Sequence, residues 1–167
     1  SIFNSLSRHR IAIISDIENT TRDIIEYHID DEENEISYMM ADSGGIVQAD
    51  NETLLSDVRA RANDAINSSD LILFVLEYDR MTDFDEFIVK LLRRSGKPVL
   101  VVANKADNPK RAIEAYQHMS LGLGDVVAVS AVQTRGFGEL KAKIAEMLKE
   151  LGFGFVKNEL HEGMLRL

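Results

Sequence analysis

The chain has 167 residues, of which 45% are hydrophobic, and it carries a formal net charge of −9 at pH 7. This length and apolar content fit one domain, or one domain with a tail, built around a full hydrophobic core. The absence of cysteine excludes a disulfide scaffold and any thiolate metal site. The acidic charge argues against broad contact with a nucleic-acid backbone, and no stretch has the pattern of a membrane span or a signal peptide.

Apolar runs and helical patterns alternate along most of the chain. Residues 24–30 and 35–41 predict two strands, and the polar turn 31–34 between them predicts an antiparallel hairpin. Downstream, strands alternate with helices, which predicts a doubly wound, mostly parallel α/β sheet. The downstream elements that we expect are a helix over 52–67, a strand over 71–76, a helix over 83–95, a strand over 99–104, a helix over 109–119, a strand over 126–129 and a helix over 137–151.

The strand over 99–104 ends abruptly on polar residues. Its apolar run does not alternate, which indicates a strand buried on both faces. Asn104, Lys105 and Asp107 follow it, at the edge where open α/β sheets bind ligands.

These three side chains suit guanine. The carboxylate of Asp107 can accept hydrogen bonds from both N1–H and the 2-amino group, the Asn104 amide can bond the acceptor edge or a neighbouring loop, and the Lys105 stem can lie along the base. Adenine would leave Asp107 unpaired, and sites built in this way discriminate by roughly 10⁴-fold. By itself, the short motif fits equally well a polar strand end that leads into a loop.

Three weaker motifs lie at other predicted strand ends and loops. Asp42, followed by Ser-Gly-Gly, can hold a magnesium-bound water, and a glycine N–H there can approach a terminal phosphate. A threonine in the loop 19–23 can ligate magnesium only while a terminal phosphate is present, which would make the loop a switch. Ser130 and Ala131 are small enough to let backbone amides reach the base. Each of these motifs, taken alone, also fits an ordinary turn or helix cap.

In combination and in this order, the motifs resemble the translation-factor class of P-loop GTPases. They are most similar to the first GTPase domain of the Der (EngA) family of bacterial tandem GTPases that act in ribosome assembly. Era and TrmE proteins are related, but the run over 93–98 favours Der. The resemblance rests on Arg10–Ile14, Thr20–Asp23, Asp42–Ile46, Leu92–Val99 and Asn104–Asp107.

The resemblance implies a cytoplasmic enzyme that binds GTP and GDP, hydrolyses GTP with Mg²⁺, and acts on the large ribosomal subunit through other domains, with no membrane partner. In this family K⁺ is also implicated in hydrolysis. No catalytic side chain is assigned, because Ile46 stands where Ras-like proteins have a water-orienting glutamine. The implied site consists of Thr21 and Asp42 for magnesium, Thr21 and the Gly45 N–H for the terminal phosphate, Asn104, Lys105 and Asp107 for guanine, and Ser130 and Ala131 closing over the base.

The sequence departs from the family pattern in three places. Glu18-Asn19 replaces a Pro-Gly pair, and the segment 77–81 replaces Asp-Gly-Arg-x-Gly. No phosphate-loop motif occurs, so we expect this loop and the first strand to precede Ser1. Residues 1–151 would then form a GTPase domain without its first strand, inactive alone, and 152–167 a linker with the start of another strand.

A missing first strand would leave its two neighbours about 9.6 Å apart in the middle of the sheet. One hypothesis is that the tail 163–167 fills this position.

Two other functions stay open on the sequence alone. One is a G-like interaction module that does not hydrolyse nucleotide. The other is an unrelated doubly wound domain such as a response-regulator receiver, which would require an acidic cluster at the strand ends.

Overall fold

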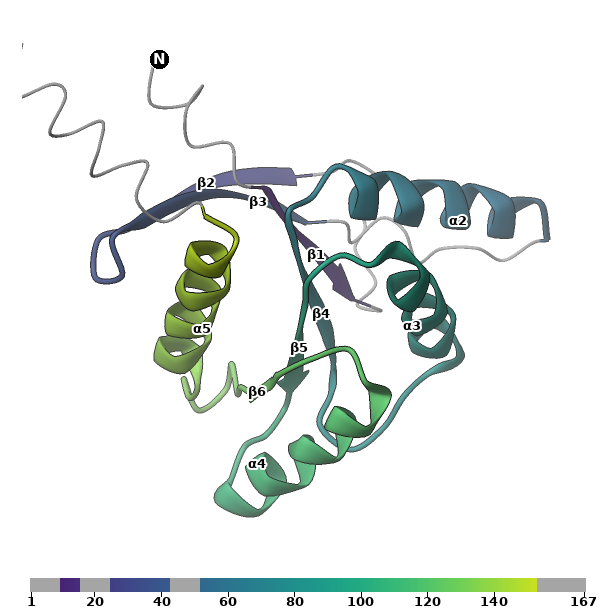
Figure 1. The fold of residues 1–167 in the computed structure, drawn as a ribbon. Helices are drawn as coiled ribbons and strands as arrows, with labels where there is room; N and C mark the ends of the chain where they lie inside the picture. The colour runs from purple at the N-terminus through teal and green to yellow at the C-terminus, as the bar shows by residue number, and fades with distance from the viewer. Residues whose placement is uncertain (1–9, 16–24, 43–51, 153–167) are drawn as a thin grey trace, which may run out of the picture.

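The computed structural model describes residues 10–15, 25–42 and 52–152. In this part of the chain, six strands form one sheet in the order β2-β3-β1-β4-β5-β6 (Figure 1). Neighbouring strands are parallel except for the antiparallel pair of β2 and β3. The strands are β1 (Arg10–Ser15), β2 (Ile25–Asp31), β3 (Ile36–Asp42), β4 (Leu71–Glu77), β5 (Val99–Asn104) and β6 (Val126–Ala128).

Helices cover both faces of this sheet. Helix α5 lies on one face, and α2, α3 and α4 lie on the other (Figure 1). The helices are α2 (Glu52–Asn67), α3 (Asp83–Ser95), α4 (Pro109–Ala115), the 3₁₀ helix η2 (Tyr116–Leu121) and α5 (Phe137–Glu150). The predicted fold class, a doubly wound and mostly parallel sheet with one antiparallel hairpin, is confirmed. No helix in the described ranges is long and apolar enough to cross a membrane.

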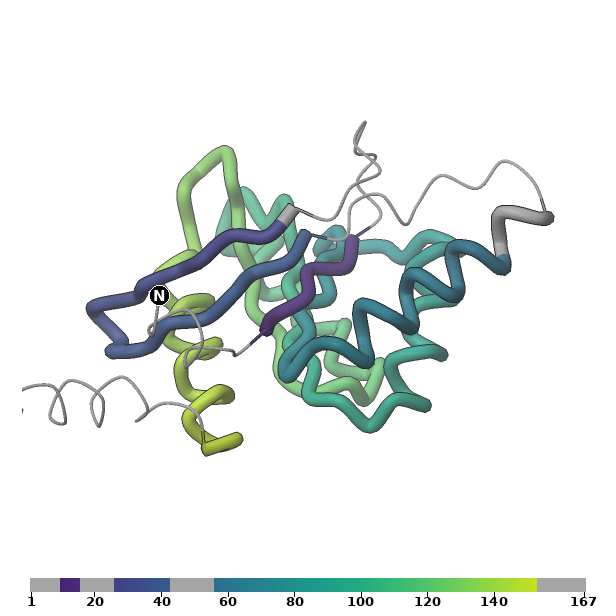
Figure 2. The backbone as a smooth tube through the Cα atoms, turned by 90° about the horizontal axis from the view of Figure 1, so that it is seen from above, coloured from purple at the N-terminus to yellow at the C-terminus, as the bar shows by residue number. Residues whose placement is uncertain are grey.

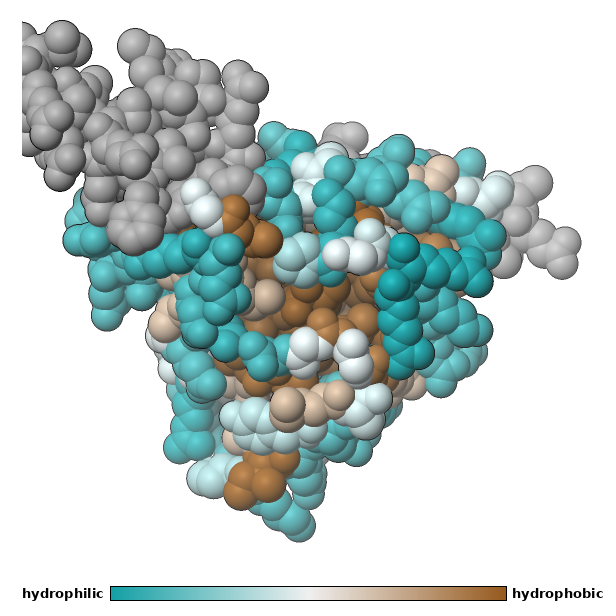
Figure 3. All heavy atoms as spheres, in the orientation of Figure 1, coloured by the Kyte–Doolittle hydropathy of each residue, from teal (hydrophilic) through white to brown (hydrophobic). Residues whose placement is uncertain are grey.

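The central strands bury both of their faces. In β4, Ile72 and Phe74 belong to the core beneath α2 and α3, whereas Leu71 and Leu73 belong to the core beneath α5. All four side chains are at most 3% exposed. This explains the non-alternating apolar runs, because successive side chains in a strand point to opposite faces. Seen from the side in Figure 3, hydrophobic residues gather over the sheet between the hydrophilic outer surfaces of α5 and α3.

Local signals fix helix α3 at its predicted bounds. The Thr82 hydroxyl accepts a hydrogen bond from the Asp85 N–H (3.1 Å), and the Asp85 carboxylate accepts one from the Thr82 N–H (2.9 Å). This reciprocal cap satisfies two amide groups at the start of the helix. At the other end, Gly96 takes a left-handed conformation (φ 68°) that ends the helix.

The helix expected over 109–119 is shorter than predicted. Helix α4 ends at Ala115, and the chain continues as the 3₁₀ helix η2 to Leu121. Short 3₁₀ segments commonly tighten the end of an α-helix, and Gly122, with a φ of 69°, ends this one.

The centre of the sheet differs from our expectation. Strand β1 pairs with β3 over Arg10–Ile13 and with β4 over Ile11–Ser15, so residues 10–15 occupy the position that we expected to be vacant (Figure 2). The hypothesis that residues 163–167 fill it is therefore wrong; the tail itself lies outside the described residues. The physical reason is the apolar run of β1, whose Ile11 and Ile14 are fully buried on opposite faces.

Candidate functional site

The carboxyl ends of the parallel strands meet at one edge of the sheet, which we call the rim. Asp42, Glu77 and Asn104 are the last residues of β3, β4 and β5, and Glu77 is paired in register with Asn104. Strands β3 and β5 are separated by β1 and β4, which places them three strand spacings, or about 14 Å, apart. The register links Asp42 through Ile13 and Leu73 to Leu100, so Asp42 lies level with the start of β5, four residues before Asn104, and the two residues are further apart than this lateral spacing.

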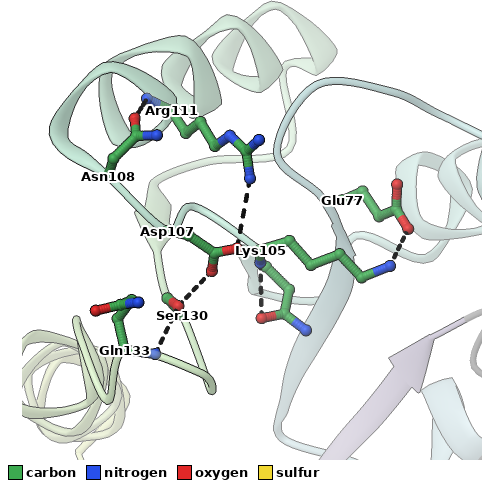
Figure 4. Close-up of polar contacts among 8 residues, drawn as sticks. Glu77, Lys105, Asp107, Asn108, Arg111, Ser130 and Gln133 are labelled. Carbon is green, nitrogen blue, oxygen red and sulfur yellow. Dashed lines mark hydrogen bonds and ion pairs between the residues drawn. The ribbon is translucent and has the colours of Figure 1, made fainter.

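A tight turn after β5 shapes the Asn104–Asp107 motif. The Asn104 side-chain oxygen accepts a hydrogen bond from the Lys105 N–H (2.8 Å), and Lys105 adopts a left-handed conformation with a φ of 64°. Ala106 is buried, and its N–H donates to the Val129 carbonyl at 3.1 Å. This anchoring leaves the Lys105 and Asp107 side chains at the surface of the rim (Figure 4).

Both oxygens of the Asp107 carboxylate have partners. The Ser130 hydroxyl donates to Oδ1 at 2.5 Å, and Nη1 of Arg111, in the first turn of α4, approaches Oδ2 at 3.4 Å (Figure 4). Ser130 is fully buried, and its oxygen also accepts the Gln133 N–H at 3.1 Å. The carboxylate is therefore held in one orientation while remaining partly exposed.

Ser130 reaches Asp107 because the segment after β6 is tightly folded. Ser130 and Arg135 exchange two backbone hydrogen bonds of 3.0 Å each. The following Gly136 has a φ of 81°, and a Cβ there would lie 2.2 Å from the Ala128 carbonyl oxygen. Only glycine fits this position without a shift of the backbone. Ala131, next to Ser130, is exposed beside the same rim.

The Lys105 side chain extends across the end of β4. Its ammonium forms an ion pair with Glu77 Oε1 at 2.6 Å, and Arg80 Nε contacts Glu77 Oε2 at 2.7 Å. The hydrogen bond from Lys105 is the main reason that the pKa of Glu77 lies below its usual value. In the sequence, the segment 77–81 stands out only as a departure from the family pattern, which does not predict this contact.

The contact of Arg111 with Asp107 was not predicted either. One sequence signal could have indicated Arg111, and another could have indicated Glu77. Asp107 and Arg111 have the i, i+4 spacing of helical ion pairs, with Pro109 opening the helix between them. Glu77 ends the strand next to β5, so adjacent strand order would have placed it beside Asn104.

The structure brings together five of the predicted site residues at one end of the rim: Asn104, Lys105, Asp107, Ser130 and Ala131. Asp42 ends β3, beyond β4 and β1, and lies level with Leu100 rather than with Asn104. Thr21 and Gly45 lie outside the described residues, so their roles stay predictions. Within the described ranges, no group of three or more His, Cys, Asp or Glu residues could hold a metal ion by itself, and no acidic cluster of the receiver type is present.

An apolar cavity of about 370 Å³ lies between α5 and the sheet. Most of its lining residues are apolar or aromatic, for example Ile13, Tyr38 and Leu140. The cavity reaches the rim at Asn104 and Ala131. The charged groups Lys105 and Asp107 are not among its lining residues, so the polar chemistry of the rim lies outside this cavity.

An open α/β sheet with charged turns at its carboxyl edge is typical of nucleotide-binding proteins. Residues 1–105 match the model of the family described as 50S ribosome-binding GTPase. The chain belongs to this GTPase family.

Relatives named GTPase Der confirm the resemblance expected from the motifs. The chain is 40% identical over 141 residues to GTPase Der of Limosilactobacillus reuteri, which covers 84% of this chain and 32% of that protein. It is 40% identical over 151 residues to GTPase Der of Salinispora tropica, covering 90% of this chain and 32% of the relative. The chain thus spans about a third of the length of the curated relatives that it matches.

Two solved structures share the fold. Era from Aquifex aeolicus bound to GDP·AlF4⁻ aligns with a TM-score of 0.67 at 20% identity, covering 84% of this chain and 56% of Era. Era in complex with MgGDPNP and a fragment of 16S ribosomal RNA aligns with a TM-score of 0.68 at 22% identity, covering 84% of this chain and 57% of that protein.

Proposed function

We propose that the complete protein containing this chain is a GTP-binding and GTP-hydrolysing switch of the Der type that acts in maturation of the large ribosomal subunit in the cytoplasm. The observation that carries the proposal is the Asp107 carboxylate, fixed by Ser130 at the end of β5 beside Lys105. Family membership and the 40% identity to GTPase Der support the same conclusion.

The arrangement around Asp107 suits the donor edge of guanine. Each carboxylate oxygen has two lone pairs, so an oxygen that already accepts from Ser130 or Arg111 can also accept from a base N–H. The anchored carboxylate needs little reorganisation when the base arrives, which favours affinity. An adenine base, which lacks these donors, would leave a desolvated carboxylate without a partner.

The carboxyl end of β3 also suits Mg²⁺. Magnesium prefers oxygen ligands, keeps several waters and relies on substrate phosphates, so a single protein carboxylate such as Asp42 fits it better than a full cage would. We propose that Asp42, through water, and Thr21 hold the ion, and that the Gly45 N–H contacts the terminal phosphate. The ion would neutralise phosphate charge. Potassium, implied by the family, would assist hydrolysis in place of a glutamine at Ile46.

Titration calorimetry of the complete protein with GDP and with ADP tests the binding claim. We expect strong preference for GDP, together with phosphate release from GTP that requires Mg²⁺ and rises when K⁺ replaces Na⁺. Equal affinity for the two nucleotides would refute the proposal. Guanine-specific binding without phosphate release would instead favour the non-hydrolysing interaction module.

Sedimentation with purified large ribosomal subunits tests the partner. We expect association that differs between GDP and a non-hydrolysable GTP analogue. Identical association in both states would contradict the proposed switch.

A further inference from the structure

The end of β4 and the turn that follows it contact Lys105 directly and reach Asp107 through Arg111. Glu77 and Tyr78 make these contacts, and neither has a role in the proposed function. Glu77 is the last residue of β4 and lies opposite Asn104 in the register. The end of β4 therefore lies beside Asn104, where the Asn104–Asp107 motif begins.

Glu77 fixes the Lys105 side chain. The Lys105 ammonium lies 2.6 Å from Glu77 Oε1, although the lysine side chain is 62% exposed and its flexible stem could otherwise point into solvent. The second Glu77 oxygen is engaged by Arg80 at 2.7 Å, so the carboxylate is itself held in place. The Lys105 stem is thereby laid along the rim, where a base would stack against it (Figure 4).

Tyr78 acts on the other charged residue through Arg111. The Arg111 guanidinium lies over the Tyr78 ring, 5.3 Å from its centre, and contacts Asp107 Oδ2 at 3.4 Å. A guanidinium supported on an aromatic face has fewer orientations to sample. The ring therefore keeps Arg111 beside the carboxylate, on the oxygen that Ser130 does not occupy.

The backbone of the turn is anchored as well. The Tyr78 N–H donates to the Asn104 carbonyl at 2.9 Å, and the Tyr78 carbonyl accepts from Gln117 at 3.2 Å. The Glu77 carbonyl lies 2.8 Å from the ring nitrogen Nε2 of His118, which is buried. These contacts tie the turn to β5 and η2, so it can serve as a fixed support.

We propose that Glu77 and Tyr78 are positioning residues for guanine recognition: Glu77 holds Lys105 along the base face, and Tyr78 holds Arg111 against Asp107. This inference rests on the proposed function, because it concerns the same base site. The Glu77–Lys105 contact and the Tyr78–Arg111 contact should affect nucleotide binding differently. Lys105 touches the base face, which is common to related purines, whereas Asp107 reads the 2-amino group, which is present in guanine and absent from hypoxanthine.

A double-mutant cycle on the complete protein tests the Glu77 contact. Glu77→Gln should weaken GDP binding by about three- to fivefold, the upper part of the range for an exposed ion pair, and should weaken inosine diphosphate binding equally. In a Lys105→Met background the same change should have no effect, because Glu77 acts only through Lys105. A loss of equal size in both backgrounds would show a general structural role and would overturn the assignment.

Glu146→Gln is the matched control for the Glu77 change. It breaks a lysine–glutamate contact of 3.3 Å, between Lys143 and Glu146 on α5, away from the rim. GDP affinity should not change. A loss as large as that of Glu77→Gln would show that removing any such carboxylate weakens binding, and would overturn the role of Glu77.

A second cycle tests Tyr78 independently. Tyr78→Leu should lower the preference for GDP over inosine diphosphate by about threefold, and this effect should vanish in an Arg111→Met background. Tyr78→Phe keeps the ring and should behave as the parent protein does. An equal loss in the Phe and Leu variants, or an unchanged preference in Tyr78→Leu, would refute the role of the ring.

Nucleotide binding by the parent protein distinguishes a failure of the proposed function from a failure of this inference alone. A parent that does not prefer GDP over ADP overturns the proposed function and this inference with it. A parent that prefers GDP but shows purely additive effects in both cycles overturns this inference alone. Thermal melting of each variant checks that the fold is retained.

Discussion

Removing the Ser130 hydroxyl should weaken guanine binding, because this group orients the Asp107 carboxylate. Ser130→Ala deletes the donor that lies 2.5 Å from Asp107 Oδ1 and the acceptor of the Gln133 N–H. A hydrogen bond to a charged group contributes about 1.5–3 kcal/mol. Since Asp107 is partly exposed and Arg111 remains beside it, the lower end of this range applies.

A loss of about 1.4 kcal/mol corresponds to a tenfold weaker GDP affinity, measured by titration calorimetry of the complete protein. The same variant should lower the melting temperature by about 2–4 °C for each kcal/mol of stability that it loses. Unchanged GDP affinity in Ser130→Ala would refute the claim that Ser130 orients the carboxylate.

Ser95→Ala is the matched control for this experiment. Ser95 also donates one hydrogen bond, to the Leu92 carbonyl at 2.7 Å, and accepts one, from the Lys97 N–H at 3.1 Å. It lies at the end of α3, before the amino end of β5, so it is far from the rim. Ser95→Ala should reduce stability while leaving GDP affinity unchanged, and a tenfold loss of affinity here would show that the effect of Ser130→Ala is not specific to the site.

Two further predictions concern stability and can be measured on the chain itself. Gly136→Ala should destabilise the fold by about 2–4 kcal/mol in urea unfolding, because the new Cβ would meet the Ala128 carbonyl at 2.2 Å and the backbone φ is 81°; a cost below about 0.5 kcal/mol would contradict the close approach. Burial raises the pKa of Tyr38 to about 12 from its usual value of 10. The folded protein therefore holds this proton more tightly than the unfolded chain does, and the resulting stability is present below pH 10 and is lost as the pH rises toward 12. Tyr38→Phe should remove this part of the pH dependence, and an unchanged slope in the variant would count against burial of the hydroxyl.

Most of the fold could be predicted from local sequence. The apolar runs of β4 and β5 and the capping residues Thr82 and Gly96 define their elements without reference to the rest of the chain. The end of α4 was less predictable, because no strong helix-breaking residue stops the pattern at Ala115. The central place of β1 could not be predicted, since it depends on which strands are left to pair with β3 and β4.

The candidate site was predictable in part. The identity and spacing of Asn104, Lys105 and Asp107 indicate their chemistry, and strand β3, which ends at Asp42, runs parallel to β5 as predicted. The contacts that orient these groups depend on long-range register, as with Glu77 beside Lys105, 28 positions apart in the chain. Sequence patterns of short range carry no such information.

The central claim is that Asp107 recognises the donor edge of guanine. Asp107→Asn tests it most directly, because the asparagine oxygen can still accept from Ser130 while its amide nitrogen can donate to the 2-oxo group of xanthine. In competition binding to the complete protein, we expect the parent to prefer GDP over xanthosine diphosphate and the variant to reverse this order. A variant that loses GDP without gaining xanthosine diphosphate, or a parent that binds both equally, would contradict the claim.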